Sequence, residues 1–163
     1  MGKEVKTNAM RALDKAGIKY SINLYSCDEF IDAVHIADML NQPYESSYKT
    51  LVAKGKSGEH FVYLLPIAEE LDLKAAARSV GEKSVELIAV KDITRVTGYI
   101  RGGCTPLAMK KQFKTVIDSS AKNFSEIIIS GGRIGAQIFL SPIELGELIK
   151  AKFEPIVFKK EVE

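Results

Sequence analysis

The stretch YKTLVAKGKSGEHFVYLL, residues 48–65, decides the fold. Two short apolar runs, Tyr48–Ala53 and Phe61–Leu65, flank a segment rich in glycine and lysine, residues 54–58. Strands of this length that are separated by a few turn-forming residues pair as a β-hairpin. The sequence therefore predicts an antiparallel hairpin near the middle of the chain, with the other elements arranged around it.

A helix and a strand are expected at the N-terminal end of the chain. Thr7 or Asn8 can cap a helix over residues 8–16, and Gly17 suits the left-handed residue that ends such a helix. Residues 20–24 alternate apolar and polar side chains, which is typical of a half-buried strand.

Two more helices and four short strands are expected around the hairpin. Apolar spacing predicts a helix over residues 33–40, which has to end before Pro43. Asp72 is the expected N-cap of a further helix that runs to Val80. The strand candidates are Val85–Ile88, Thr115–Asp118, Ser125–Ser130 and Gln137–Leu140.

The last expected helix opens with Ser141 as N-cap and Pro142 at the first helical position, a frequent arrangement at helix starts. Short strands therefore dominate the middle of the chain, and helices lie between and after them. This order favours the α+β class, with a mixed, mostly antiparallel sheet and surrounding helices. No linker or internal repeat divides the sequence, so we expect residues 1–163 to form a single domain.

Composition indicates an ordinary globular chain of 163 residues, 46% hydrophobic and 27% charged, with a net charge of +2. Its apolar runs are strand-sized and its N-terminus has no apolar signal core, so we expect a cytoplasmic protein without a membrane partner. Cys27 and Cys104 form no disulfide framework, which favours a reducing compartment. With His35 and His60 they form no metal-ligand spacing, so no metal is expected.

Lysines cluster at two places, Lys54 with Lys56 and Lys110 with Lys111 and Lys114. Such clusters can bind phosphates by neutralising charge and releasing counterions. A solvated surface without a partner is the other interpretation, and a net charge this small does not decide between them.

Two glycine-rich segments, GYIRGGCTP at 98–106 and SGGRIG at 130–135, are candidates for a site. Glycine permits positive φ and close approach of another molecule, and consecutive amides in such loops can bind an anion or a carbonyl oxygen. Two tight turns without any function are the alternative. Neither segment has the spacing of a dinucleotide-binding or phosphate-binding loop.

Lys49 and Cys104 are the remaining side chains with chemical interest. Lys49 lies near the start of a strand, where it either points to solvent or enters a cleft as a fixed cation. Cys104 is either a small packing residue or a nucleophile. The sequence has no Gly-x-Ser-x-Gly elbow. What remains is a site built from a lysine and backbone amides.

These motifs resemble those of the bacterial YbaK/EbsC family of Cys-tRNA(Pro) deacylases, which are related to the editing insertion domain of prolyl-tRNA synthetases. The resemblance runs in family order over roughly residues 7–157. The segments that carry it are Tyr48–Leu51, Leu71–Lys74, Thr97–Tyr99, Gly102–Leu107, Lys110-Lys111, Thr115–Asp118 and Ile129–Arg133.

The resemblance implies a compact, partly barrel-like mixed sheet with surrounding helices, and hydrolytic editing of mischarged tRNA without a metal or cofactor. For cysteine, it implies that the thiol of the substrate attacks its own ester and leaves as a cyclic thiolactone. Tethering the nucleophile to the ester removes much of the entropic barrier. The protein then has to orient the ester and stabilise the developing oxyanion.

On this resemblance we assign catalytic roles to Lys49, Gly102, Gly103 and Gly131. The expected substrate-binding residues are Tyr25, Thr50, Thr105, Pro106, Ser130, Gly132 and Gln137. Two residues depart from the family pattern. Gln137 stands where some members carry Asp, and Ala108 replaces a glycine that often follows the Pro-Leu pair.

The substrate and partners are left open in part. The acceptor end of a mischarged tRNA is the expected ligand and prolyl-tRNA synthetase a candidate partner, with no role for DNA. Alternatives are a deacylase for another small amino acid, such as Ala-tRNA(Pro), a non-catalytic module that binds tRNA or a synthetase, and an α+β domain without a tRNA role.

Overall fold

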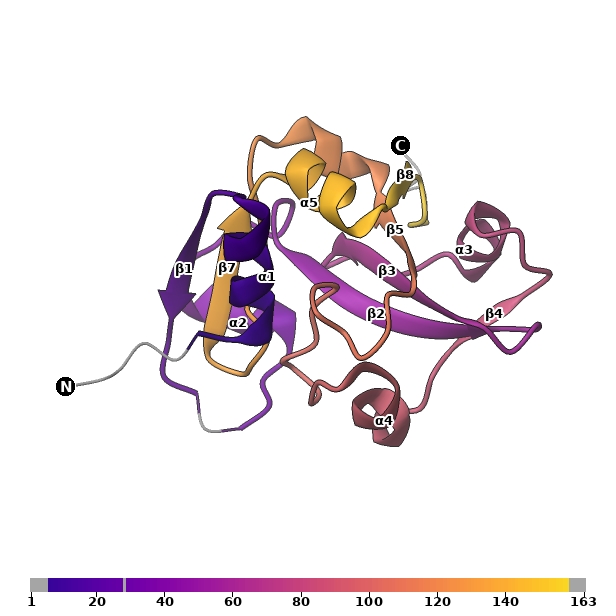
Figure 1. The fold of residues 1–163 in the computed structure, drawn as a ribbon, viewed down its shortest axis with the longest axis horizontal. Helices are drawn as coiled ribbons and strands as arrows, with labels where there is room; N and C mark the ends of the chain where they lie inside the picture. Colours follow the sequence, from indigo (N-terminus) through magenta and orange to yellow (C-terminus); the bar gives the residue numbers. More distant parts are fainter. Residues whose placement is uncertain (1–5, 28, 159–163) are drawn as a thin grey trace.

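The computed structural model of the chain describes residues 6–27 and 29–158, which form two β-sheets with helices packed around them (Figure 1). The larger sheet has the strand order β4-β2-β3-β5-β8 and the smaller sheet the order β1-β7-β6. The pairs β3–β5 and β5–β8 are parallel, and the other pairs are antiparallel. The strands are β1 (Tyr20–Leu24), β2 (Tyr48–Gly55), β3 (His60–Pro66), β4 (Val85–Leu87), β5 (Lys114–Asp118), β6 (Ile127–Ser130), β7 (Ala136–Leu140) and β8 (Lys152–Glu154).

Three of the helices begin at the predicted caps. The hydroxyls of Thr7 and Ser141 and the carboxylate of Asp72 each accept hydrogen bonds from amides in the first turn of their helix. Gly17 ends the first helix in the left-handed conformation, with φ of 71°. The helices are α1 (Asn8–Ala16), α2 (Ala33–Met39), α3 (Leu73–Ser79), α4 (Ile93–Thr97) and α5 (Pro142–Ile149), with 3-10 turns η1 (Val90–Asp92) and η2 (Ser119–Asn123).

The predicted α+β class is confirmed, but the strands do not close into a barrel within the described residues. The two sheets meet at one isolated parallel bridge, between Ser47 and Ile128, instead of along a continuous ladder. The prediction of a partly barrel-like sheet is corrected in this respect. An opening is left beside β2.

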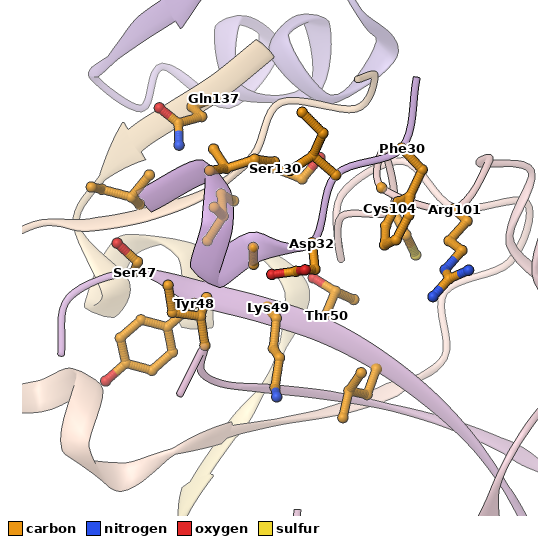
Figure 2. A pocket seen from close by; sticks show the side chains of 18 of the residues that line it. Phe30, Asp32, Ser47, Tyr48, Lys49, Thr50, Arg101, Cys104, Ser130 and Gln137 are labelled. Carbon is orange, nitrogen blue, oxygen red and sulfur yellow. The ribbon is translucent and has the colours of Figure 1, made fainter. Parts of the chain in front are cut away.

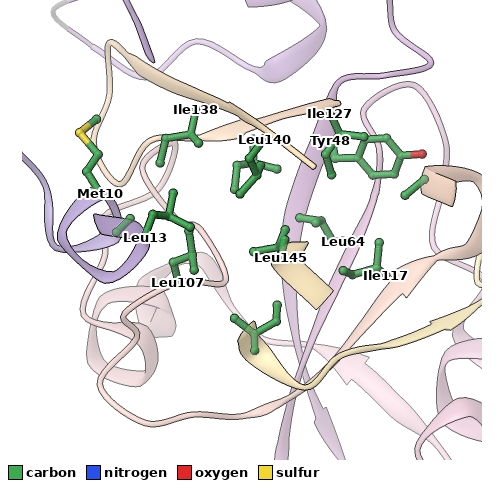
Figure 3. Close-up of a cluster of buried hydrophobic side chains, with 14 of the residues drawn as sticks. Met10, Leu13, Tyr48, Leu64, Leu107, Ile117, Ile127, Ile138, Leu140 and Leu145 are labelled. Atoms are coloured by element: carbon green, nitrogen blue, oxygen red, sulfur yellow. The ribbon is translucent and has the colours of Figure 1, made fainter. Parts of the chain in front are cut away.

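The main hydrophobic core fills the space between the two sheets and is covered by α1 and α5 (Figure 3). Leu13 of α1 and Leu145 of α5 are completely buried there, together with Leu64 of β3 and Ile138 of β7. A second cluster lies on the other face of the larger sheet, beneath α3. Burial of each large aliphatic side chain contributes about 1.5–3 kcal/mol, so these clusters hold the elements that position the site.

Short elements account for the differences from the predicted secondary structure. The helix α4, the strand β8 and the two 3-10 turns span only three to five residues each, too few to show a clear hydrophobic period. The strand predicted to begin at Ser125 begins at Ile127, because Ser125 and Glu126 are exposed and outside the ladder.

Candidate functional site

The edge of β2 that faces away from β3 is only partly paired. From Ala53 onward this edge pairs with β4, and the Val52 carbonyl accepts a hydrogen bond from the Ile88 amide at 3.0 Å. Near the start of β2, the Ile128 amide donates to the Ser46 carbonyl at 2.9 Å. Between these two points no strand of the described residues pairs with the edge, which leaves a gap centred on Thr50.

Thr50 has three polar groups at this gap: its backbone N–H, its backbone C=O and its side-chain Oγ1. The Ile67 amide donates to the Ser47 carbonyl and the Gly55 amide to the Glu59 carbonyl, so the odd-numbered residues of β2 exchange hydrogen bonds with β3. The N–H and C=O of Thr50 therefore point to the opposite edge. Its Oγ1 is buried and has no hydrogen-bond partner among the described residues. Buried polar groups are nearly always paired, so this arrangement indicates a place for ligand atoms.

The gap opens into a cavity of about 390 Å³ (Figure 2). Much of its wall is apolar and comes from α2, β2 and the segment that precedes α4. The polar side chains in the wall come from seven separate segments of the chain. They are Tyr25, Asp32, Gln42, Ser47, Lys49, Thr50, Arg101, Ser130 and Gln137.

Lys49 lines the same cavity as Thr50, although its side chain projects from the opposite face of β2. The cavity reaches residues of both faces because it runs around the free edge of the strand. Burial lowers the pKa of the Lys49 ammonium, and the carboxylates of Glu70 and Glu69 oppose this shift. No described residue forms a hydrogen bond or ion pair with Lys49 Nζ, so a ligand anion can take that position.

Of the predicted glycine-loop residues, Gly102 and Ser130 line the cavity, whereas Gly103, Gly131 and Gly132 do not. The Gly103 amide donates to the Ile100 carbonyl at 3.0 Å and the Gly131 amide to the Ala136 carbonyl at 2.8 Å. Both amides therefore close turns and are not free to bind an oxyanion in this conformation.

The glycines have a packing role instead. A Cβ on Gly103 would lie 2.9 Å from the Arg133 Cα, so the two glycine loops pack backbone against backbone. A Cβ on Gly102, whose φ is +87°, would lie 3.0 Å from the Phe30 ring. Larger residues at either position would push the loops apart, and this close packing brings Gly102 and Ser130 to one cavity.

Thr105 and Pro106, two predicted substrate-binding residues, lie away from the cavity wall. Thr105 is completely buried, and its Oγ1 has no partner among the described residues. Pro106 lines a separate hollow of about 220 Å³ between its own loop, α1 and α5. The neighbouring Ala108 adopts a φ of 55°, which is the left-handed region where a glycine would be unstrained.

Cys104 lines the cavity, but its thiol is not activated. Burial raises the pKa of Cys104 to about 11, so the thiol is neutral near pH 7. A thiolate is the reactive form of cysteine, and none of the features that stabilise it is dominant here. The environment therefore favours the packing interpretation of Cys104 over the nucleophile interpretation.

Gln137 of β7, which was expected to bind the substrate, lines the cavity, and it is bound to Gln42, for which the sequence predicted no role. Gln42 Nε2 donates to Gln137 Oε1 at 2.8 Å, and Gln137 Nε2 donates to Gln42 Oε1 at 2.9 Å. Asn23 Nδ2 donates to the same Gln137 oxygen at 3.2 Å. This amide network ties the segment after α2 to the smaller sheet and so fixes the α2 wall of the cavity.

Three further residues at the cavity, Phe30, Asp32 and Arg101, were also missed. The Arg101 guanidinium carbon lies 3.9 Å from the centre of the Phe30 ring. Asp32 caps α2 by accepting a hydrogen bond from the His35 amide at 3.0 Å, and this bond is the main cause of its lowered pKa. Helix capping was the one sequence signal that could have located Asp32. Tyr25, which was predicted, also lines the cavity, and burial raises the pKa of its hydroxyl.

Residues 6–27 and 29–158 contain neither a cluster of metal ligands nor a membrane-spanning helix. This part of the chain contains no group of three His, Cys, Asp or Glu side chains that could hold a metal ion. None of its helices combines the length and the apolar character that crossing a bilayer requires.

Comparison with known proteins gives matches in sequence and in structure. The family model for the aminoacyl-tRNA editing domain matches residues 30–148. A protein of Enterococcus faecalis, named "Putative Cys-tRNA(Pro)/Cys-tRNA(Cys) deacylase EbsC", is 38% identical over 156 residues, which is 95% of each chain.

Two crystal structures share the fold at lower sequence identity. A hypothetical protein superimposes with a TM-score of 0.85 at 20% identity, over 93% of this chain and 100% of that chain. A "putative trans-editing enzyme for prolyl tRNA synthetase" superimposes with a TM-score of 0.79 at 22% identity, over 93% and 96% of the two chains.

Proposed function

This chain belongs to the family of aminoacyl-tRNA editing domains, and we propose that it is a trans-editing deacylase that removes cysteine from mischarged tRNA. Cys-tRNA(Pro) is the preferred substrate in this proposal and Cys-tRNA(Cys) a second one, in line with the name of the relative from Enterococcus faecalis. The observation that carries the proposal is the gap beside Thr50, where the edge of β2 has no partner strand among the described residues and a buried hydroxyl without a partner faces a cavity.

The size of the cavity limits which part of the substrate enters it. At about 390 Å³ it lies at the small end of the range of roughly 300–1,000 Å³ that is usual for small-molecule sites. An aminoacyl group with its ribose suits this volume, and the remaining nucleotides of the tRNA stay outside. The apolar wall from α2, with Ile36 and Ala37, suits a small, weakly polar side chain such as that of cysteine.

In the proposed reaction the substrate supplies its own nucleophile. The cysteine sulfur attacks the ester carbonyl carbon and forms a C–S bond, while the bond from that carbon to the ribose oxygen breaks. The thiol proton passes to the leaving ribose oxygen, so the products are a cyclic thiolactone and free tRNA. Because sulfur and ester belong to one molecule, the protein has only to hold a reactive conformer.

The residues that line the cavity have different roles in the proposed reaction. The Thr50 N–H and Oγ1 hydrogen-bond the aminoacyl group, and Lys49 provides a positive charge for the ester or for the terminal phosphate. Ser130 and Tyr25 bound the site from the smaller sheet and the segment after β1. Gly102 keeps its backbone close to the substrate because it has no side chain.

A panel of charged tRNAs tests this function. The purified protein is incubated with Cys-tRNA(Pro), Cys-tRNA(Cys), Ala-tRNA(Pro) and Ser-tRNA, and the released product is identified by mass spectrometry. We expect the fastest release from the cysteinyl substrates and a thiolactone, or the cysteine formed from it, as the product. Release of alanine and cysteine at similar rates would contradict the thiol-assisted route.

Two alternatives remain as outcomes of the same experiment. Editing of Ala-tRNA(Pro) would require an attacking water, because alanine has no thiol, and an apolar cavity separates near-isosteric side chains only weakly. A non-catalytic module would retain tRNA in a gel-shift assay without raising ester cleavage above background. An association with prolyl-tRNA synthetase and a cytoplasmic location agree with the proposed activity and are tested by co-purification and by fractionation.

A further inference from the structure

Five basic side chains from four segments form a surface that the cavity does not use. We call this surface the cationic patch and define it by Lys54, His60, Arg95, Lys110 and Lys111. The four lysine and arginine side chains are exposed, and His60 is partly exposed. The patch lies on the face of the larger sheet that α4 covers, around the cluster of Val52, Val62 and Val96.

Direct contacts connect the members of the patch. Lys54 and His60 are directly opposite each other in the β2–β3 ladder. The His60 ring lies edge-on to Phe113 at 5.9 Å between centroids, and Lys111 Nζ lies 6.0 Å from the centre of the same ring. Lys110 Nζ donates a hydrogen bond to the Arg95 carbonyl at 3.3 Å. Residues distant in sequence are therefore held together on one face.

Positive charge is in excess in the patch. Asp92 pairs with Arg95 at 3.3 Å, and Glu86 lies opposite Lys54 in the β2–β4 ladder. Against these two carboxylates stand four permanent cations. Burial first, and then the charges of Lys54, Arg95 and Lys111, lower the pKa of His60, whereas Asp92 raises it.

Lys114 does not belong to the patch, although it is near Lys110 and Lys111 in the sequence. It is the first residue of β5 and lies opposite Phe61, whose side chain packs in the cluster beneath α3. Lys114 also acts on the carboxylate of Glu82. It therefore projects from the other face of the sheet, and the expected cluster of three lysines is divided between two faces.

The patch adjoins the cavity through α4. Ile93, the first residue of this helix, lines the cavity, and Arg95 in the same helix belongs to the patch. A ligand whose end occupies the cavity can therefore extend over α4 to the patch. A tRNA has such a form, because its aminoacylated 3′ end is followed by a duplex with a dense row of phosphates.

We propose that the cationic patch binds backbone phosphates of the tRNA acceptor stem while the aminoacylated end occupies the cavity. This inference rests on the proposed function, because it takes the tRNA 3′ end as the ligand of the cavity. The contacts are to phosphates and carry no base recognition, so the patch binds acceptor stems of different sequence.

The test compares a double variant, Lys110→Gln with Lys111→Gln, with the control Lys114→Gln. Uncharged tRNA is titrated against each protein over a range of salt concentrations. Each phosphate contact contributes about 0.7–0.9 to the slope of log K against log salt, so the double variant should lower the slope by about 1.4–1.8. If the two proteins bind equally at about 1 M salt, this difference in slope makes the affinity of the double variant about 25- to 60-fold lower at about 0.1 M salt. The control should bind like the wild type.

A short substrate separates this inference from the proposed function. The double variant should cleave the cysteinyl ester of adenosine at the wild-type rate but cleave Cys-tRNA(Pro) at sub-saturating concentration with a lower kcat/KM. If the wild type cleaves neither substrate, the proposed function fails, and the tRNA titration still decides whether the patch binds RNA. All variants are compared by circular dichroism, and Lys54→Gln replaces the double variant if that protein does not fold.

Three results would overturn the inference. The first is wild-type affinity and salt slope in the double variant, and the second is an equal loss of affinity in Lys114→Gln. The third is unchanged tRNA binding together with lost binding of prolyl-tRNA synthetase, which would assign the patch to a protein partner instead of RNA.

Discussion

Replacement of Thr50 by valine should stabilise the fold and weaken the activity at the same time. The Thr50 Oγ1 is buried without a hydrogen-bond partner among the described residues. An unpaired buried hydroxyl destabilises a protein by about 1–3 kcal/mol according to mutational data, and valine has the same shape without the polar atom. A gain of about 1 kcal/mol raises the melting temperature of a chain of this size by about 2–4 °C.

The activity should change in the opposite direction. If Oγ1 binds the aminoacyl group, its removal deletes one hydrogen bond worth about 0.5–1.5 kcal/mol. Deacylation of Cys-tRNA(Pro) should then fall by a factor between about 2 and 13, since about 1.4 kcal/mol corresponds to tenfold. Single-turnover cleavage and thermal melting of the same preparations provide both quantities.

Two other threonines provide matched controls. Thr105 Oγ1 is also buried without a partner but lies away from the cavity, so Thr105→Val should raise the melting temperature and leave cleavage unchanged. Thr115 Oγ1 donates to the Phe113 carbonyl at 3.0 Å, so Thr115→Val should lower the melting temperature. The reasoning is refuted if Thr50→Val melts below the wild type, or if it cleaves at the rate of Thr105→Val.

The remaining predictions concern four other residues. Lys49→Ala should reduce cleavage by about 100-fold, as does loss of one electrostatic contact to a developing oxyanion, and normal single-turnover release by this variant would contradict the role of Lys49. Cys104→Ser should retain activity, because the buried thiol is neutral near pH 7, and mass spectrometry should detect no aminoacyl adduct on Cys104 in the wild type. Gln42→Ala should lower the free energy of unfolding by about 1–3 kcal/mol, because it leaves part of the buried Gln137 amide unpaired, and should reduce discrimination of cysteine from bulkier amino acids in the tRNA panel. Ala108→Gly should raise stability in denaturant titrations by up to about 1 kcal/mol, since Ala108 occupies the left-handed region.

Local features of the fold could be predicted from the sequence. The β2–β3 hairpin and the helix caps Thr7, Asp72 and Ser141 depend on residues only a few positions apart, and the structure confirms them. Pairing of the strands into two sheets depends on contacts between distant segments. The open edge of β2 could not be predicted for this reason, because no local pattern indicates where a partner strand ends.

In the candidate site, too, some features could be predicted from the sequence and others could not. Lys49, Thr50, Gly102 and Ser130 lie around one cavity, and the resemblance to a known family named them all. The amides of Gly103 and Gly131 donate to carbonyls of their own loops in this conformation, and glycines that allow donation and glycines that allow close packing look alike in a sequence.

Contacts between distant residues left no signal in the sequence. The reciprocal amide pair joins Gln42 and Gln137 across 95 positions of the chain. In the predicted lysine cluster, Lys114 lies on the other face of the sheet, because β5 begins at this residue and β-strand side chains alternate between faces.

The narrowness of the opening beside β2 has a consequence for how the protein behaves at high concentration. The unpaired N–H and C=O groups of an exposed strand edge can pair with a strand of another molecule, which leads to aggregation. Here β4 and the bridge to Ile128 close the edge on both sides of Thr50, so an incoming chain finds only the short stretch between Ser47 and Ala53 to pair with. Main-chain groups at this edge are thus accessible to a small ligand, while an added strand would have too little of β2 to pair with.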